Sequence, residues 1–324
     1  MLETYYEVEK ILYVIISVIG VPVNVVAIVI LSRGKCGLST CTTRYLLAMA
    51  VSDLLVIIIV VIFYRLYYHY FPVNFQNSTN VCKAIYALAY AAANCSVWFT
   101  VSFTLDRFVA ICCQKLKTKY CTRTVAAFVV VTTGVLLCLK NIPFYFAYQP
   151  RWIINNVPWL CVLTDSYYTD PGWVAFDWLD KVLTPLVPFA VILLLNALTI
   201  RHILVANRVR KGLKNQSKGE NRNDPEMESR RRSVVLLFML SANFIFLWLV
   251  YVVEFAYYQI ARRGIDRNHW EIIFHEAGYL LSNFSCCTNA FIYAATQSKF
   301  RGQIKIAVKY PVSSMLQFMN KAAL

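Results

Sequence analysis

Charged residues are scarce in this sequence. Only 15 % of the 324 residues are Asp, Glu, Lys or Arg, whereas 59 % are apolar; soluble domains carry about 25 % charged residues. A chain of this composition cannot bury its apolar surface in one water-soluble core. Histidine is scarce too, with four residues at scattered positions that lack metal-ligand spacing. Because a hydrolytic triad and a phosphate-binding loop are also missing, the sequence argues against an enzyme.

The sequence contains long runs of uncharged, mostly apolar residues. Residues 84–105 contain no charged side chain, and a helix over this stretch, rising about 1.5 Å per residue, crosses the roughly 30 Å core of a bilayer. Further apolar runs follow the same pattern along the chain. The sequence therefore predicts an all-α membrane protein, a seven-transmembrane helix bundle, with spans at about 11–32, 45–68, 83–113, 124–147, 177–207, 233–260 and 271–296.

Basic residues define the predicted orientation. The net charge is +15, and most of the 32 Lys and Arg follow the first, third and fifth spans or lie in the tail. They flank membrane segments and form no nucleic-acid-reading module. By the positive-inside rule these turns face the cytosol, so we expect a plasma-membrane protein with an extracellular N-terminus and a cytoplasmic C-terminus. The polar linker 212–228 is expected to be disordered, and residues 298–309 to form an amphipathic helix on the inner membrane surface.

Eleven cysteines divide by side of the membrane. Only Cys82 and Cys161 lie on the predicted outer side, where disulfides persist. A bridge between them ties the start of the third span to the loop after the fourth. The other nine are expected to be small packing residues. Asn77-Ser78-Thr79 is a glycosylation sequon on the outer side, so Asn77 is the predicted glycosylation site.

Polar side chains inside the spans are candidates for function, because each is costly in hydrocarbon unless it finds a partner. A carboxylate surrounded by amides and hydroxyls can hold a small hard cation such as sodium, and no other cofactor is predicted. The alternative is that these groups only hydrogen-bond the helices together; we favour this for Asn24, whereas the charge of Asp53 favours a switching or ion-binding role. The candidate residues are Asn24, Asp53, Ser96, Ser285 and Asn289.

An ordered set of motifs runs through the spans. They are Asn24 in the first span, 47–53 in the second, Asp106-Arg107-Phe108 closing the third, Pro188 in the fifth, Trp248 in the sixth and 289–293 in the seventh. Together they resemble the motifs of rhodopsin-like (class A) G-protein-coupled receptors over about 11–309. The resemblance implies the Cys82–Cys161 disulfide, an extracellular ligand and a heterotrimeric G protein as partner. It assigns coupling and activation to Asp106, Arg107, Phe108, Asn196, Trp248, Asn289 and Tyr293.

Several family positions are changed. Val250 and Ala290 stand where helix-kinking prolines are usual, so we expect straighter sixth and seventh helices. Asn196 replaces a tyrosine, and Arg230 replaces a common acidic partner of Arg107, so that ionic lock is expected to be absent. A constitutively active or signalling-silent receptor is therefore one alternative. A channel or transporter, which would show internal repeats or several intramembrane charges, is a weaker one.

The resemblance places a ligand pocket among the outer halves of the second, third, fifth, sixth and seventh helices. Ala89 stands where an amine receptor has aspartate and Asn283 where a photoreceptor has lysine, which argues against both classes. Opposed charges above aromatic rings favour an amino acid or a small peptide terminus. Residues 142–145 and 186–188 also resemble an orphan group associated with aromatic amino acids and short peptides. The candidate pocket residues, each of which could instead be a packing or solvated residue, are Arg65, Tyr86, Ala89, Tyr90, Asp180, Lys181, Trp248, Tyr251, Glu254, Glu276 and Tyr279.

Overall fold

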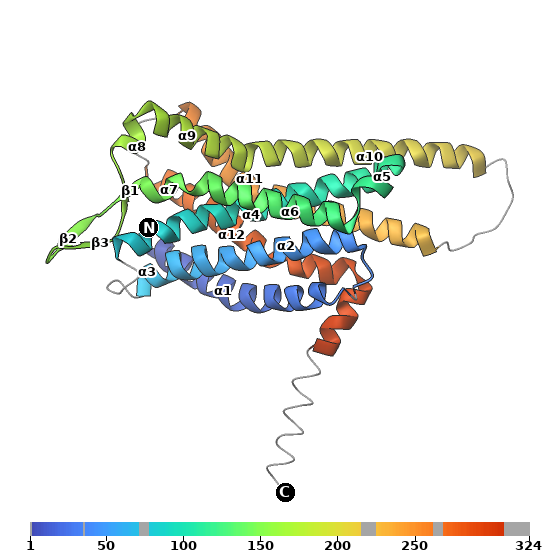
Figure 1. The fold of residues 1–324 in the computed structure, drawn as a ribbon, viewed down its shortest axis with the longest axis horizontal. Coiled ribbons are helices and arrows are strands. Elements are labelled where there is room, and N and C mark those ends of the chain that lie inside the picture. The colour runs from blue at the N-terminus through green and yellow to red at the C-terminus, as the bar shows by residue number, and fades with distance from the viewer. Residues whose placement is uncertain (1, 35, 71–77, 215–224, 262–267, 308–324) are drawn as a thin grey trace, which may run out of the picture.

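The computed structural model describes residues 2–34, 36–70, 78–214, 225–261 and 268–307. Within these ranges long helices lie side by side in one bundle, and a short β-hairpin projects beyond the end of the bundle near the N-terminus (Figure 1). We call this the hairpin end, and the end that carries helix 298–307 the opposite end. The arrangement confirms the predicted all-α class and the helix bundle.

Seven helical segments form the bundle within the described ranges. In chain order they are α1 (Leu2–Ser32), α2 (Thr40–Val56) continued by the π-helix η1 (Ile57–Leu66) and α3 (Tyr67–Tyr70), α4 (Thr79–Cys112), α6 (Arg123–Asn141) with α7 (Pro143–Phe146), α9 (Pro171–Lys181) continued by the π-helix η3 (Val182–Leu186) and α10 (Val187–Lys214), α11 (Pro225–Ala261) and α12 (His269–Thr296). The short α5 (Gln114–Tyr120) follows α4, and α8 (Ser166–Thr169) precedes α9. Each segment overlaps one predicted span, although every segment begins earlier than expected, most clearly the first, the sixth and the fifth.

The predicted cytoplasmic linker 212–228 differs from the structure, and the predicted amphipathic segment 298–309 extends beyond the described residues. The expectation of disorder over 212–228 is wrong at both ends, because α10 reaches Lys214 and α11 begins at Pro225. A helix nucleated in the bundle extends at little cost into a polar stretch. The middle of that stretch, 215–224, lies outside the described residues. The amphipathic segment is helical over 298–307, and its end at 308–309, like the sequon residue Asn77, is not among the described residues.

Side-chain caps fix where several helices begin. The side chains of Ser39, Thr122 and Asp170 each accept a backbone N–H from the first turn of α2, α6 and α9. At the start of α12 a reciprocal pair forms: Asn268 Oδ1 accepts the Glu271 N–H at 3.0 Å, and Glu271 Oε2 accepts the Asn268 N–H at 2.9 Å. These caps satisfy donors that a helix leaves unpaired at its N-terminus.

The outward faces of the helices are apolar. Phe128 on α6 and Phe246 on α11 are 70 % and 72 % exposed, as are many neighbouring aliphatic residues to lesser degrees. By length and composition, six of the described helical segments are suited to cross a membrane. The remaining one, α12, is 28 residues long but carries polar residues on its buried face. Lipid therefore contacts the apolar exterior, while the polar groups of α12 face the bundle interior.

The helices α11 and α12 approach closely at Gly278. A Cβ atom built on Gly278 would lie 3.0 Å from Tyr251 Cα, so a larger residue would have to push the two helices slightly apart. The close approach brings the Tyr251 ring edge-on to the Tyr279 ring, with centroids 5.0 Å apart. These two rings form part of the cavity described below.

Four short strands lie between α7 and α8. They are β1 (Tyr148–Gln149), β2 (Trp152–Ile154), β3 (Val157–Trp159) and β4 (Val162–Leu163). β2 pairs with β3 and β1 with β4, both antiparallel. Asn155 and Asn156 join β2 to β3 with φ of 52° and 63°; Asn tolerates this left-handed region, which two-residue hairpin turns require.

A disulfide joins Cys82 at the start of α4 to Cys161 between β3 and β4, as the sequence predicts. The hydroxyl of Thr79 donates to the Leu160 carbonyl oxygen at 2.7 Å next to this bridge. The strand segment is therefore anchored to α4 by one covalent bond and one buried hydrogen bond.

Removing the bridge tests how much it stabilises the bundle. The disulfide closes a loop with a sequence separation of 79 residues, and loss of a native disulfide commonly lowers the free energy of unfolding by about 2–5 kcal/mol. We expect Cys161→Ser to lower the thermal midpoint of the detergent-solubilised protein clearly. The control is Cys138→Ser, which changes an exposed free cysteine. Equal midpoints for both variants would contradict a stabilising role.

Candidate functional site

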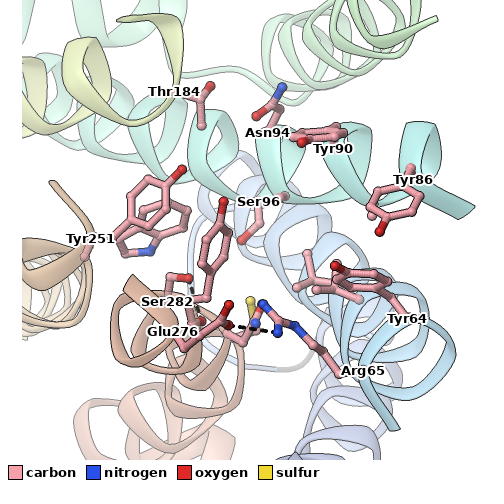
Figure 2. A pocket seen from close by; sticks show the side chains of 18 of the residues that line it. Tyr64, Arg65, Tyr86, Tyr90, Asn94, Ser96, Thr184, Tyr251, Glu276 and Ser282 are labelled. Atoms are coloured by element: carbon pink, nitrogen blue, oxygen red, sulfur yellow. Dashed lines mark hydrogen bonds and ion pairs between the residues drawn. The ribbon is translucent and has the colours of Figure 1, made fainter. Parts of the chain in front are cut away.

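A cavity of about 240 Å³ lies inside the hairpin-end half of the bundle. In Figure 2, side chains of α4 face those of η1, α11 and α12 across it. Residues from α2, η3 and α9 complete the lining. The volume is below the range of about 300–1,000 Å³ typical of drug-sized ligand sites, so the interior matches a small ligand or the end of a larger one.

Six aromatic rings line the cavity. They belong to Tyr64, Tyr86, Tyr90, Trp248, Tyr251 and Tyr279. Packing from behind fixes their orientation: Tyr90 stacks on Phe144 with ring centroids 3.9 Å apart, and Tyr86 stacks on Tyr148 at 4.3 Å. The walls are therefore rigid surfaces suited to an aromatic or aliphatic group.

Arg65 of η1 forms the charged side of the cavity. Its Nη1 lies 2.8 Å from Glu276 Oε2 on α12 and 3.5 Å from Glu9 Oε1 on α1. The Tyr64 and Tyr279 rings lie 5.2 and 5.7 Å from the guanidinium carbon, within cation–π range. One arginine thus joins three helices and faces two carboxylates.

A second charged group lies on the wall formed by α4, α6 and α9. Asp180 forms an ion pair with Lys140, and Asn94 Nδ2 donates to Asp180 Oδ1 at 3.3 Å and to Asn141 Oδ1 at 3.1 Å. The charge of Asp180 is therefore balanced by one lysine. The nearby hydroxyl of Thr184 is buried, lines the cavity and has no hydrogen-bond partner within the described part of the chain.

The helix break at Thr184 follows from local sequence. Thr184 has φ −152° and ψ 107°, which are extended rather than helical values. Pro185 follows it, and the residue before proline is disfavoured in the helical region. Pro188 is the second residue of α10, where a missing backbone N–H costs nothing. The break turns the Thr184 side chain toward the cavity.

Nine of the eleven predicted pocket residues line this cavity, and Lys181 and Glu254 do not. Lys181 Nζ lies 2.5 Å from Asp177 Oδ2; because neighbouring residues diverge by about 100° around a helix, the inward position belongs to Asp180. Glu254 Oε2 lies 3.0 Å from His275 Nδ1, and this histidine separates it from the cavity. The prediction of Glu254 and Lys181 as pocket contacts is therefore corrected.

The predicted set lacked several lining residues, among them Tyr64, Thr184, His275, Ser282 and Asn283. Helical spacing from Tyr279 could have identified Ser282 and Asn283, which lie three and four positions later on the same face. Thr184 gave no signal of this kind, because its position depends on the helix break.

Asp53 is completely buried at the centre of the bundle. Ser96 Oγ donates to its Oδ1 at 2.5 Å and Asn289 Nδ2 donates to its Oδ2 at 2.8 Å. Asn243 of α11 in turn donates to Asn289 Oδ1 at 3.4 Å. The carboxylate therefore connects α2, α4 and α12 directly and α11 through one amide.

Asn24 and Ser285 lie near this centre without a hydrogen bond to Asp53. Asn24 Nδ2 donates to the Gly20 and Cys286 carbonyl oxygens at 3.0 and 2.9 Å, which fastens α1 to α12 and agrees with a structural role. Ser285 Oγ donates to the Ser282 carbonyl oxygen and accepts the Trp248 indole N–H at 3.3 Å. The predicted five-residue cluster is therefore a three-residue centre with two neighbours.

Asp106 and Arg107 lie buried at the opposite end. Arg107 Nε donates to Asp106 Oδ2 at 2.9 Å, and Arg107 Nη1 donates to Ser233 Oγ of α11 at 3.1 Å. The thiol of Cys41 donates to Asp106 Oδ1 at 2.8 Å. Burial raises the pKa of Cys121 to about 11, so its thiol keeps its proton and donates to the Asp106 carbonyl oxygen at 3.7 Å.

The other residues assigned to activation stand apart from that pair. Asn196 Nδ2 donates to the Ile192 carbonyl oxygen of its own helix. Tyr293 is buried, with its ring 5.9 Å from the Phe300 ring of helix 298–307, and Phe108 is half-buried. The side chain of Arg230 lies outside the described residues.

This bundle has known counterparts. The family model described as 7 transmembrane receptor (rhodopsin family) matches residues 23–293. The chain belongs to this family. It is accordingly a multi-pass membrane receptor and not an enzyme, as predicted.

Individual relatives are distant in sequence. The receptor is 23 % identical over 302 residues to C-C chemokine receptor type 1 of Macaca fascicularis, covering 91 % of this chain and 77 % of the relative. It is 24 % identical over 299 residues to C-C chemokine receptor type 3 of Macaca mulatta, with the same coverage. A gastrin/cholecystokinin type B receptor of Canis lupus familiaris is 35 % identical over 141 residues, 43 % of this chain and 30 % of the relative.

The Cys41 thiol gives a test of the group around Asp106. Removing a donor from a buried acceptor costs about 1 kcal/mol or more, so we expect Cys41→Val to lower the thermal midpoint of the purified receptor. Cys41→Ser keeps a donor of similar size and should lose less. A valine variant as stable as the serine variant would show that the thiol contributes packing alone.

Proposed function

We propose that this receptor lies in the plasma membrane with its N-terminus outside, binds a small peptide or amino-acid-like ligand in the cavity, and activates a heterotrimeric G protein. The observation that carries the proposal is the aromatic-walled cavity with charged groups at two sides, in a bundle whose opposite end holds a buried Asp-Arg pair. The relatives named above are receptors for chemokines and for gastrin and cholecystokinin, which supports a ligand of peptide character.

The size of the cavity limits what enters it. About 240 Å³ accommodates an amino acid or the end of a peptide, and a folded protein ligand could insert only one terminus. Stacked rings such as Tyr90 and Phe144 offer flat surfaces for an aromatic side chain. Arg65 and Glu276 offer charged partners for polar ends of the ligand.

A chain of contacts leads from the cavity toward the centre of the bundle. Trp248 lines the cavity and donates to Ser285, which lies one helical turn before Asn289, and Asn289 donates to Asp53. A ligand that binds one arrangement of these groups more tightly shifts the population toward it. At the opposite end of the bundle, α10 and α11 then move away from Arg107, and its guanidinium becomes available to the G protein.

The alternative is a receptor that signals without ligand or not at all. One observation favours it: among the α11 side chains that the structure describes, from Arg231 onward, the partner of Arg107 is the neutral hydroxyl of Ser233 rather than a carboxylate. A neutral partner holds a guanidinium more weakly than a charged one does, so the inactive arrangement is less strongly favoured.

Arg107→Ala is the deciding variant for the G-protein proposal. We expect it to reduce G-protein activation about tenfold or more in cells, because the guanidinium is the group offered to the partner. Activation is measured with Gα chimeras against a panel of amino acids and dipeptides, with Arg123→Ala, an exposed basic residue at the start of α6, as control. Activity that is independent of every panel member yet lost in Arg107→Ala would support the ligand-independent alternative. Activity retained in Arg107→Ala would refute coupling through this residue.

We also propose that Asp53 holds a sodium ion. The carboxylate oxygens and the Ser96 hydroxyl oxygen are hard donors, and Asn289 can present its amide oxygen after a rotation of the amide. These residues fit a small hard cation, which would neutralise the one carboxylate at the centre of the bundle and stabilise the arrangement that encloses it.

Sodium binding is tested by thermal unfolding of the purified receptor. Replacing choline chloride by sodium chloride at constant ionic strength should raise the midpoint, by an amount that grows with the logarithm of the sodium concentration above its Kd. Asp53→Asn removes the charge with little change of volume and should abolish the difference between the salts. A difference that survives in Asp53→Asn would place the ion elsewhere.

A further inference from the structure

Among the side chains that the structure describes, the charges around Arg65 do not balance. One guanidinium faces the carboxylates of Glu276 and Glu9, at 2.8 and 3.5 Å, so the cluster carries an excess of one negative charge when both carboxylates are ionised. Asp180 on the other wall is already balanced by Lys140 and supplies no compensating cation. An uncompensated carboxylate is costly in a buried setting, and Glu9 is only 2 % exposed.

Polar atoms in and beside the cavity lack hydrogen-bond partners within the described residues. Arg65 Nε is a buried donor without an acceptor, and Glu276 Oε2 forms an ion pair but accepts no hydrogen bond. Thr184, 8 % exposed, brings an unpartnered hydroxyl to the cavity from η3. These atoms are buried behind the cavity surface, so a ligand reaches them only when the lining side chains of Arg65, Glu276 and Thr184 rotate toward it. Because buried polar groups are nearly always paired in folded proteins, the missing partners indicate which groups a ligand would bring.

The unpartnered donor belongs to Arg65 and the acceptor to Glu276, and these two side chains are in direct contact. Figure 2 shows Arg65 and Glu276 side by side at one wall, with Tyr64 close to Arg65. A ligand must therefore offer a cationic donor to Glu276 and an acceptor to Arg65 from neighbouring atoms. An α-ammonium group next to a carbonyl group has this arrangement.

We propose that the ligand of this cavity presents an unblocked α-ammonium group to Glu276 and the adjacent carbonyl oxygen to Arg65, as the free N-terminus of a short peptide or an amino-acid amide does. The proposal rests on the proposed function and specifies its ligand class. In this arrangement Arg65 does not bind a carboxylate of the ligand. It keeps its ion pairs with Glu276 and Glu9 and donates a hydrogen bond to the neutral carbonyl oxygen of the ligand.

Amino-acid amides and free amino acids differ in net charge, and this difference predicts which of them binds more tightly. An amide or peptide N-terminus adds one positive charge and neutralises the cluster, whereas a free amino acid adds none because its carboxylate cancels its ammonium. A free carboxylate would also compete with Glu276 for the guanidinium. Amides are therefore expected to bind more tightly than the corresponding free acids.

Four small probes test the inference on the purified receptor without a G protein. They are L-phenylalaninamide, L-phenylalanine, 2-phenylethylamine and N-acetyl-L-phenylalaninamide, with binding measured at pH 7.4 by thermal shift and by equilibrium titration. We expect phenylalaninamide to bind tightest, the free acid and phenylethylamine more weakly, and the uncharged acetyl derivative at least about tenfold more weakly, because it offers Glu276 no cationic partner.

Variants assign each part of the ligand to a residue. Glu276→Gln and Glu9→Gln should both weaken phenylalaninamide by about tenfold or more, and Glu9→Gln does so without changing a cavity-lining residue. Arg65→Lys keeps the charge but replaces the guanidinium fork, so it should abolish the preference for phenylalaninamide over phenylethylamine. Asp177→Asn is the control, because Asp177 pairs with Lys181 outside the cavity and its loss should leave every affinity unchanged.

Specific outcomes overturn the inference. It fails if the acetyl derivative binds as tightly as phenylalaninamide, if Glu276→Gln and Glu9→Gln both leave phenylalaninamide unaffected, or if no probe binds. A receptor that binds phenylalaninamide as expected but activates no G protein would refute the proposed function and leave the ligand class standing. Activation by N-blocked peptides alone would do the reverse.

Discussion

Polar groups inside this bundle depend on partners within the protein or in its cavity, because the apolar exterior of the helices faces lipid that offers none. This constraint decides where the helices meet. Asp53 joins α2 to α4 and α12, Arg65 joins η1 to α1 and α12, and Asp180 joins α9 to α4 and α6. The buried arginine at the opposite end, Arg107, reaches α11 through Ser233. The Arg65 and Asp180 junctions border the cavity, the Asp53 junction lies at the centre and the Arg107 contact lies at the opposite end, so together they fix the packing of the helices along the bundle.

The sequence lacks the helix-bending prolines that its family usually has in the sixth and seventh helices, and α11 and α12 are each continuous. Irregular geometry occurs elsewhere, in the π-helices η1 and η3. Both border the cavity: η1 carries Tyr64 and Arg65, and η3 carries Thr184. A π-helix rotates the side chains that follow it relative to a regular α-helix, and such segments are frequent at functional sites. In this receptor the local irregularities shape the ligand cavity directly.

The class of fold was predictable because lipid imposes it on composition: long uncharged runs and basic turns leave few other solutions. The Cys82–Cys161 bridge was predictable from the sides of the membrane, and most cavity residues from the resemblance to the receptor family. Neither the resemblance nor helical spacing could predict which charged side chains pair with one another. That Glu254 is shielded by His275, and that Arg65 faces Glu9 across a distance of more than fifty residues in sequence, depends on how the helices rotate against one another. Rotation is set by packing contacts such as the one at Gly278, which leave no periodic trace in the sequence.

The excess carboxylate beside Arg65 bears on how a ligand could drive the switch. Glu9 and Glu276 belong to α1 and α12; both are attracted to the Arg65 guanidinium, while they repel each other. A cation bound between the two carboxylates would offset that repulsion and favour the arrangement in which α12 lies nearer α1. Because α12 also carries Ser285 and Asn289, which contact Trp248 and the Asp53 carboxylate, a small displacement of this one helix changes the cavity floor and the buried centre together. For a ligand of the class proposed above, the binding energy therefore acts first on the seventh helix, α12, rather than on the fifth, α9 to α10.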